Sequence, residues 1–483
     1  MALGDTDIRY VCLSDLHLGE EDSLLTHVNQ DTGEADPANK SPVLTELATC
    51  LNYLINRNED KERQPTLILL GDILELALTN NNIAAMAFER FLELFMAENQ
   101  ELFEKIIYIP GNHDHHLWES ARETQYVLNY LATTDPGEPL KIPWHNTNIF
   151  MEGDPNPVPS FFLNGIIHRY KHLKKFNINT AYPNFGLRQG DRCVLFHHGH
   201  FIESIYQLMT TLKNLIFPKL ETRHPKIWDL ESENFAWIDF FWSTLGRSGK
   251  WGQDVETIYE KMQSEEQFRK LLDDLAHSLA EKYYITGLGD WLNNKVSEMI
   301  VNGLVNNLVK TERSLTDDPL SPDAKQGLSD YLNFPLWMQL EEECAKRHQY
   351  SPHEATFVFG HTHKPFAEVK TCAAYRDTNV PVYNTGGWVV ETTEPAPSHG
   401  GAVVLLNGNL DCASVNMYKE AKESDVYQVT VNEVLPPDRP PSAFFRRLQD
   451  LVQPDQIPWS RFSQTVATEV SRRAQRLKER INT

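Results

Sequence analysis

The chain has 483 residues, of which 45 are Lys or Arg and 67 are Asp or Glu, and its formal net charge at pH 7 is −22. Clustered basic side chains hold nucleic acid non-specifically, so this charge argues against a protein that coats DNA or RNA and against long nucleic acid as a partner. With 41% hydrophobic residues the chain can build large cores, and its length predicts about two or three domains or one domain with large insertions.

Cysteine usage and the absence of targeting segments predict a soluble cytoplasmic protein. The six cysteines form no CxxC pair, which argues against a disulfide framework or a thiolate zinc site and favours a reducing compartment. The N-terminus, MALGDTDIRY, lacks the basic and apolar regions of a secretory signal. No uncharged apolar run approaches the roughly 18 to 20 residues of a membrane span, so we expect no integral membrane association.

Strands and helices alternate in the N-terminal part of the chain. Buried strands are expected at residues 8–14, 65–70 and 105–109, and helices at residues 42–55 and 83–98. Each strand ends in polar residues. The alternation predicts an α/β sheet covered by helices, with the chemistry gathered at the carboxyl ends of the strands.

The rest of the chain predicts a helical insertion and a second sheet. A strand is expected at residues 192–196. Residues 201–350 look mostly helical and include Trp251 and Trp291 among several tryptophans, which favours a subdomain with an ordinary core over an apolar slot for substrate. Further strands are expected at residues 355–359, 380–383, 402–406 and 411–415. A basic amphipathic helix at residues 461–480 is expected to dock on its own domain or on a second copy, with contact to anionic lipid as the alternative.

Five polar clusters follow predicted strands. They are Asp15-x-His17, Gly71-Asp72-x-x-Glu75, Gly111-Asn112-His113-Asp114, His198-Gly199-His200 and Gly360-His361-Thr362-His363. Carboxylate, amide oxygen and imidazole suit manganese, iron or zinc. Where strand geometry persists, residues two apart point to one side, so two ligands of the DxH or HxH type can reach one ion. A single cluster would be weak evidence, but five after five strands predict a metal centre.

In this order, the clusters resemble the signature of the calcineurin-like metallophosphoesterases, which reads DxH, GDxxD/E, GNH(D/E), a lone His and GHxH. The resemblance spans about residues 8–200 and 353–418. It implies a four-layer α/β/β/α sandwich with a large helical insertion. The implied segments are 1–200 and 351–418 for the two parts of the phosphoesterase domain, 201–350 for the insertion or lid, and 419–483 for a C-terminal extension.

The resemblance also implies the ligands of two metal ions and a catalytic histidine. Asp15, His17, Asp72 and His363 would hold one ion, and Asp72, Asn112, His198 and His361 the other. A hydroxide bridging the ions would attack phosphorus, because two nearby ions can clamp the attacking and leaving oxygens. His113 would assist the leaving group, with Asp114 orienting it. Glu75 would support the loop from behind the ligands.

The fourth cluster leaves a choice between histidines. The family places the ligand immediately before the glycine, which selects His198, and His200 is the second candidate or a supporting residue. His197 would face the opposite way in a strand and is read as a packed histidine.

The substrate is less well defined by the sequence. The run GDILEL is similar to the branch containing UDP-2,3-diacylglucosamine hydrolases, but that branch commonly has Arg at the place of His113 and shorter chains. Leu76 and Asp114 depart from the phosphoprotein-phosphatase pattern. The basic stretch 168–175, with His168 and Arg169, could bind substrate phosphate. Most charged segments of this kind are solvent-exposed loops, which is the alternative interpretation.

These observations predict a metal-dependent hydrolase of a small phosphate ester or diphosphate, with two divalent ions per chain. Manganese is favoured, and iron and zinc are alternatives. The alternative functions are a non-catalytic scaffold on the same fold, and a phosphodiesterase or nuclease acting on nucleotides. The expected partner is a small phosphorylated molecule, and a homo-oligomer is compatible with the sequence.

Overall fold

The structure is a computed structural model. It describes residues 5–152, 157–216, 224–244, 312–314, 318–374, 378–422, 427–437 and 439–482. Trp251 and Trp291 of the predicted insertion core lie outside these residues. Within them, no helix is long and apolar enough to cross a membrane.

An eight-stranded mixed sheet forms one inner layer of the molecule. In spatial order its strands are β17 (Thr430–Asn432), β16 (Cys412–Lys419), β15 (Gly400–Leu406), β1 (Tyr10–Leu13), β4 (Thr66–Leu70), β7 (Lys105–Ile109), β9 (Ile178–Thr180) and β8 (Val158–Pro159). β1, β4, β7 and β9 are parallel, with Val11 opposite Leu67 in the register. Their carboxyl ends therefore meet at one edge of the sheet.

A five-stranded sheet forms the second inner layer. Its order is β10 (Asn184–Gln189), β11 (Arg192–His197), β12 (Glu354–Phe359), β14 (Thr378–Asn384) and β13 (Phe366–Cys372). β11 and β12 are adjacent and parallel, although about 150 residues of sequence separate them. Two short ribbons, β2 (Thr26–Val28) with β3 (Ala35–Lys40) and β5 (Met96–Ala97) with β6 (Gln100–Glu101), lie outside both sheets.

The two sheets pack face to face around a shared apolar core. Cys12, Ile68 and Ile107 of the large sheet belong to the same buried cluster as Phe196 and Val358 of the second sheet. All five are at most 2% exposed. This alternation of inward-facing residues along each strand is what holds the inner layers together.

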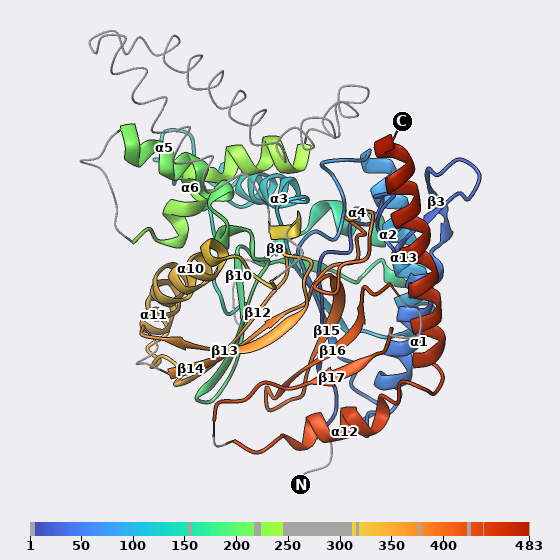
Figure 1. Ribbon diagram of the computed structural model, residues 1–483. Coiled ribbons are helices and arrows are strands. Elements are labelled where there is room, and N and C mark those ends of the chain that lie inside the picture. The colour runs from blue at the N-terminus through green and yellow to red at the C-terminus, as the bar shows by residue number, and fades with distance from the viewer. Residues whose placement is uncertain are drawn as a thin grey trace, which may run out of the picture.

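Helices cover the outer face of each sheet. Over the large sheet lie α1 (Pro42–Ile55), α2 (Asn81–Phe95), α4 (Phe161–Ile167), α12 (Ala443–Leu451) and α13 (Trp459–Asn482), and over the second lie α10 (Pro322–Tyr331), η9 (Leu332–Leu336) and α11 (Trp337–Lys346) (Figure 1). The predicted four-layer α/β/β/α sandwich with a helical insertion is therefore confirmed. The assignment of segment boundaries stays a prediction.

Local sequence explains why the first of these helices starts where it does. Ser41 caps α1 by accepting a hydrogen bond from the amide of Leu44, and Pro42 occupies the first helical position. Leu47 and Leu51, one turn apart, are buried against the sheet.

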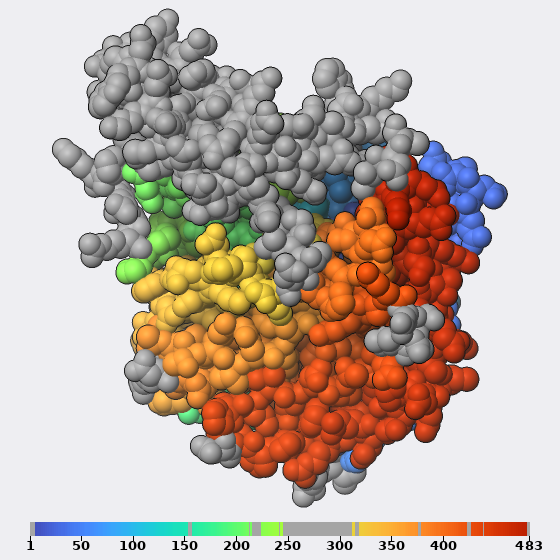
Figure 2. Space-filling view, in the orientation of Figure 1, coloured from blue at the N-terminus to red at the C-terminus, as the bar shows by residue number. Residues whose placement is uncertain are grey.

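The predicted tail helix is α13, which packs along α1 (Figure 1). Phe462, Val466 and Val470 form its buried stripe, and each is 0% exposed. The guanidinium of Arg473 donates to the carbonyl oxygen of Thr26 at 2.8 Å. In the space-filling view the C-terminal strands and this helix make up much of the visible surface (Figure 2). The tail thus docks on its own domain.

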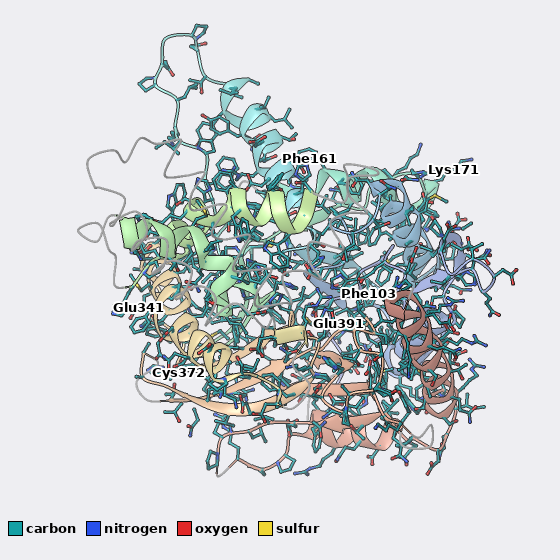
Figure 3. The ribbon with its side chains drawn as sticks, turned by 45° about the horizontal axis from the view of Figure 1, so that its top comes forward. Phe103, Phe161, Lys171, Glu341, Cys372 and Glu391 are labelled. Carbon is teal, nitrogen blue, oxygen red and sulfur yellow. The ribbon has the colours of Figure 1, made fainter. Side chains whose placement is uncertain are left out.

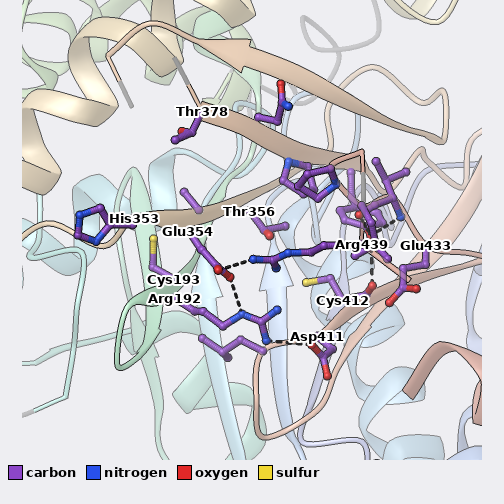
Figure 4. Close-up of a pocket in the computed structure, with 18 of the residues that line it drawn as sticks. Arg192, Cys193, His353, Glu354, Thr356, Thr378, Asp411, Cys412, Glu433 and Arg439 are labelled. Carbon is purple, nitrogen blue, oxygen red and sulfur yellow. Dashed lines mark hydrogen bonds and ion pairs between the residues drawn. The ribbon is translucent and has the colours of Figure 1, made fainter. Parts of the chain in front are cut away.

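The described part of the chain contains further helices. They are α3 (His116–Tyr126), η1 (Val127–Leu131), η2 (Lys171–Leu173), η3 (His200–Ile202), η4 (Ser204–Gln207), α5 (Leu208–Ile216), α6 (Ile227–Trp237), η6 (Ile238–Thr244) and η8 (Glu312–Ser314). Those after residue 200 belong to the predicted insertion. At the opposite end of the sheets, Arg192 at the start of β11 pairs with Glu354 and Asp411, each at 2.9 Å (Figure 4).

Candidate metal centre

Five strands deliver the predicted ligands to one place. Asp15 and His17 follow β1, Asp72 follows β4, Asn112 follows β7, His198 follows β11, and His361 and His363 follow β12. All seven side chains are at most 1% exposed. Because the strands of each sheet that carry them are parallel, their carboxyl ends bring the seven residues together.

The backbone at most of these residues is left-handed. The φ values are 52° at Asp15, 44° at His17, 50° at Asp72, 72° at His361 and 56° at His363. This conformation costs a non-glycine residue on the order of 1–3 kcal/mol, and such residues gather at functional sites. It also corrects the sequence argument, because β1 and β12 end before the pairs begin. The paired side chains converge through these turns and not through the alternation of a strand.

Glycines next to the ligands leave room for neighbouring ligands. A methyl group at Gly71 would overlap the His198 ring, and one at Gly360 would overlap the Asp15 carboxylate. Gly71 also has a φ of 81°, which side-chain-bearing residues rarely adopt. These two positions therefore require glycine, because the side chains of predicted ligands approach the backbone closely there.

The ligands fall into two clusters. One contains Asp15, His17 and His363, and the other contains Asp72, His198 and His361. Within each cluster, one donor atom from every residue lies within 4.8 Å of the others. Three donors this close can share one ion, and the grouping is the one that the family resemblance implies.

Asp72 lies between the two clusters. Its Oδ2 atom is 3.6 Å from His17 Nε2 and 3.2 Å from His198 Nε2. Asn112 joins the second cluster, with Oδ1 3.1 Å from His198 Nε2. Burial by itself raises the pKa of Asp72, but the imidazoles of His198 and His113 outweigh it and hold that pKa well below the usual range. Asp72 is thus an ionised carboxylate that faces a histidine of each cluster.

Several buried nitrogen and oxygen atoms that could bind a metal have no hydrogen-bond partner within the described part of the chain. They are His17 Nε2, Asp72 Oδ2, His361 Nδ1 and His363 Nε2. Burial lowers the pKa of His17 to about 4, so this imidazole is neutral, the form that binds metals. Unsatisfied buried polar atoms are costly unless a ligand completes them, so the residues present fit two divalent ions.

The glutamate of the second motif supports two histidines at once. Its carboxylate lies 2.8 Å from His17 Nδ1, through Oε2, and 3.0 Å from His113 Nδ1, through Oε1. This residue, Glu75, is 0% exposed. It contacts both rings through Nδ1, so the opposite nitrogen, Nε2, of each ring is turned away from the glutamate, as expected of a supporting residue.

The structure corrects the place predicted for Asp114. Its carboxylate accepts hydrogen bonds from the backbone amides of Gly111 at 2.7 Å and Ile73 at 2.8 Å, and does not contact the His113 ring in the described structure. Glu75 holds that ring instead. Asp114 therefore clamps the loops after β4 and β7 together, because an acceptor with two oxygens satisfies several turn amides at once.

Of the three neighbouring histidines in the fourth cluster, the structure brings only His198 to the ligands. The ring of His197 packs against Tyr331, with centroids 4.5 Å apart. His200 is buried and its Nε2 lies 3.4 Å from the hydroxyl of Tyr182. Both therefore belong to the surrounding packed layer.

The two residues predicted to bind substrate lie elsewhere. Arg169 is 65% exposed and its guanidinium pairs with Glu89 of α2 at 2.6 Å, while His168 contacts the carbonyl oxygen of Phe176. Lys171 of the same basic stretch lies at the edge of the molecule, well separated from Glu391 near the centre (Figure 3). The structure does not bring this stretch to the predicted ligands.

Sequence reasoning missed three residues that hold the site together. Glu203 Oε1 is 2.5 Å from His361 Nε2, and Glu391 Oε1 is 3.2 Å from His363 Nδ1. Arg313 of η8 places Nη1 3.0 Å from His113 Nε2. The two acids stand outside the five motifs, at no spacing that marks them, and Arg313 comes from the insertion.

Comparison with known proteins identifies the family. The calcineurin-like phosphoesterase model matches residues 8–255, a range that contains Asp15, His17, Asp72, Asn112 and His198. No curated protein matches the chain.

Two solved structures are matched over most of their length, with low identity and low TM-scores. A dimetal phosphatase from Danio rerio has 10% identity and a TM-score of 0.29, and the match covers 88% of this chain and 98% of that one. The phosphopantetheinyl hydrolase PptH from Mycobacterium tuberculosis has 12% identity and a TM-score of 0.24, with 79% and 91% covered. On the family match, this chain belongs to the calcineurin-like phosphoesterases.

Proposed function

We propose that this chain hydrolyses a small phosphate ester or diphosphate with two divalent ions, manganese first and iron or zinc as alternatives. The observation that carries the proposal is the position of Asp72. Its buried Oδ2 makes no hydrogen bond within the described residues and lies 3.6 Å and 3.2 Å from one histidine of each cluster. A carboxylate oxygen placed between two ligand clusters can serve both ions as a shared ligand.

Two sets of residues, with Asp72 in both, would hold the two ions. One ion would be held by Asp15, His17, Asp72 and His363, and the other by Asp72, Asn112, His198 and His361. When bound, such ions lower the pKa of a water molecule to supply the attacking hydroxide and offset negative charge on the phosphoryl oxygens.

His113 would hand a proton to the departing oxygen. Its Nδ1 is held by the carboxylate of Glu75. The ring is 2% exposed and lies beside His17, with centroids 4.8 Å apart. Its Nε2 is therefore the atom that can donate at the centre.

The expected binding partner and cellular location are part of this proposal. The charge of −22 fits a small phosphorylated substrate better than long nucleic acid. The six cysteines are all buried and free, which suits the cytoplasm that we propose as the location. Residues 201–350 are proposed as the lid or insertion subdomain.

The test is hydrolysis of p-nitrophenyl phosphate and its bis ester by metal-stripped protein, with and without Mn²⁺. We expect Mn²⁺-dependent turnover that is lost in Asp72→Asn and kept in Asp411→Asn, a matched carboxylate at the other end of the sheets. Full activity of Asp72→Asn would contradict the assignment. Binding of two ions without turnover of either ester would favour the scaffold alternative, and a faster rate on the diester would favour the phosphodiesterase.

A further inference from the structure

Arg313 enters the candidate centre from the insertion. It lies in the short helix η8, far along the chain from the motifs, and its side chain is 16% exposed. Nη1 lies 3.0 Å from His113 Nε2, the atom assigned above to proton transfer. No sequence motif marks this arginine.

One contact to the guanidinium and one to the backbone hold Arg313 in place. Nε donates to Glu391 Oε1 at 2.6 Å, and the same oxygen lies 3.2 Å from His363 Nδ1. His399 Nε2 lies 2.8 Å from the backbone carbonyl of Arg313. Glu391 thus ties the arginine to a predicted metal ligand, so its position is coupled to the geometry of the centre.

The partner on the Nη1 side is unusual for a cation. Arg313 remains charged, because Glu391 and Glu20 outweigh burial and raise its pKa. An arginine has no acceptor, so His113 Nε2 must accept from it in this contact. A phosphoryl oxygen is a stronger acceptor for a guanidinium than an imidazole nitrogen, so a bound phosphoryl group would take the place of His113 in this contact.

We propose that Arg313 binds a peripheral oxygen of a terminal phosphoryl group and selects phosphomonoesters over diesters. The inference rests on the proposed function. A monoester dianion has three peripheral oxygens, for which two ions and one fixed guanidinium provide partners. A diester has a substituent on one of these oxygens and one negative charge fewer, so it gains less from the arginine.

The test compares Arg313→Ala and Arg313→Lys with the wild type. Inorganic phosphate binding to the Mn²⁺-loaded protein is measured by calorimetry, and kcat/KM is measured for p-nitrophenyl phosphate and its bis ester. Arg192→Lys is the control, since Arg192 also pairs with acids but at the far end of the sheets. Metal content and thermal unfolding of each variant show whether the centre and the fold are kept.

For Arg313→Ala we expect phosphate affinity and monoester kcat/KM to fall about 10- to 100-fold, the range of a hydrogen bond to a charged group. The diester should lose less than about threefold, Arg313→Lys should fall between, and the control should match the wild type. Unchanged phosphate affinity, equal losses on both esters, or no phosphate binding by the wild type would overturn the proposal. If the wild type hydrolyses neither ester but Arg313→Ala loses phosphate affinity, the result would support phosphate binding by Arg313 and count against the proposed function.

Discussion

The carboxylate of Glu75 contacts Nδ1 of His113 and Nδ1 of His17, so that one buried acid orients the proposed proton donor and a predicted metal ligand together. Burial alone raises the pKa of Glu75, but both imidazoles outweigh it and the pKa lies below the usual range. Supporting residues of this kind typically change metal affinity or activity about 10- to 100-fold when they are replaced.

We therefore expect Glu75→Gln to weaken Mn²⁺ binding and to lower kcat, each by about 10- to 100-fold. The amide keeps the shape of the side chain but removes the charge that stabilises both rings. Calorimetric titration and steady-state kinetics measure the two effects. Glu343→Gln is the control, because Glu343 is also buried but accepts from the amides of Ile149 and Phe150. Two unweakened metal sites in Glu75→Gln would contradict the supporting role.

Asp114→Asn tests the clamp between the two loops. Asn keeps one oxygen and replaces the other by an NH2 group, so a donor then faces the backbone amide of either Gly111 or Ile73. We expect a loss of about 2–4 kcal/mol in the free energy of unfolding, measured in urea, because charge-assisted hydrogen bonds are lost and buried amides are left unpaired.

The same variant separates the clamp from an orienting role. If Asp114 acted on His113, the pH dependence of kcat would shift in Asp114→Asn. We expect the stability loss without such a shift, whereas Glu75→Gln should shift the profile. A shifted profile with wild-type stability would restore the orienting role.

The sequence predicts the frame of the molecule well because burial patterns are strong there. β1, β4, β7, β11 and β12 were all expected within a few residues of their observed bounds. These strands are buried on both faces and read as continuous apolar runs. The polar clusters that end them mark the carboxyl edge, where the structure gathers the seven predicted ligands.

Elements with a weak burial pattern were missed. β13 (Phe366–Cys372) is mostly half-buried, and β8 and β9 are only two and three residues long. α3 (His116–Tyr126) buries both charged and apolar residues, so its sequence lacks a clear apolar stripe. Such elements are specified by tertiary contacts more than by local pattern.

Roles that depend on contacts between distant segments were also beyond the sequence. The motif GNHD does not show that the Asp114 carboxylate faces backbone amides. Glu203 reaches a histidine 158 residues away, and Arg313 one 200 residues away. Residue type and spacing predict the ligands, whereas the side chains that contact and orient them are found only from the packing of the folded chain.

A buried ion pair joins the insertion to the segment just after the third motif. His115 Nε2 lies 2.9 Å from Glu231 Oε1 of α6, and both side chains are 0% exposed. Burial lowers the pKa of His115, but Glu231 outweighs it and raises that pKa to about 10. The hydroxyl of Tyr182 also donates to Glu231, at 2.9 Å.

Glu231→Gln should therefore lower the free energy of unfolding by about 3 kcal/mol, because it leaves a buried charge without its partner. A group with a raised folded pKa contributes its full stability below its unfolded pKa, 6.5, and loses it as the pH rises through about 10. The difference from wild type should thus be largest below about pH 6.5 in urea unfolding. Glu354→Gln, at a half-exposed pair, should cost less than about 1 kcal/mol. A loss in Glu231→Gln that does not change with pH would rule out the ion pair as its cause.

Glu420, which follows β16 and is not a predicted metal ligand, gives a pH dependence of stability. Oε2 accepts from the amide of Ala396 at 2.9 Å, whereas Oε1 has no hydrogen-bond partner in the described structure, and the residue is 1% exposed. Burial raises the pKa of Glu420 to about 7, from 4.5. The folded state therefore binds more protons than the unfolded state between these two values, and its stability falls as the pH rises through them.

Glu420→Gln removes this titration because the amide is neutral at every pH. We expect the variant to match the wild type near pH 4.5 and to exceed it by about 1–3 kcal/mol at about pH 8, where the wild type buries a carboxylate with one unpaired oxygen. Urea unfolding across this pH range measures the difference. Metal-free protein is used so that pH-dependent metal binding does not contribute to the measured stability. A variant less stable than the wild type at pH 8 would show that a favourable contact holds Glu420 ionised. It would contradict the predicted fall in stability with rising pH.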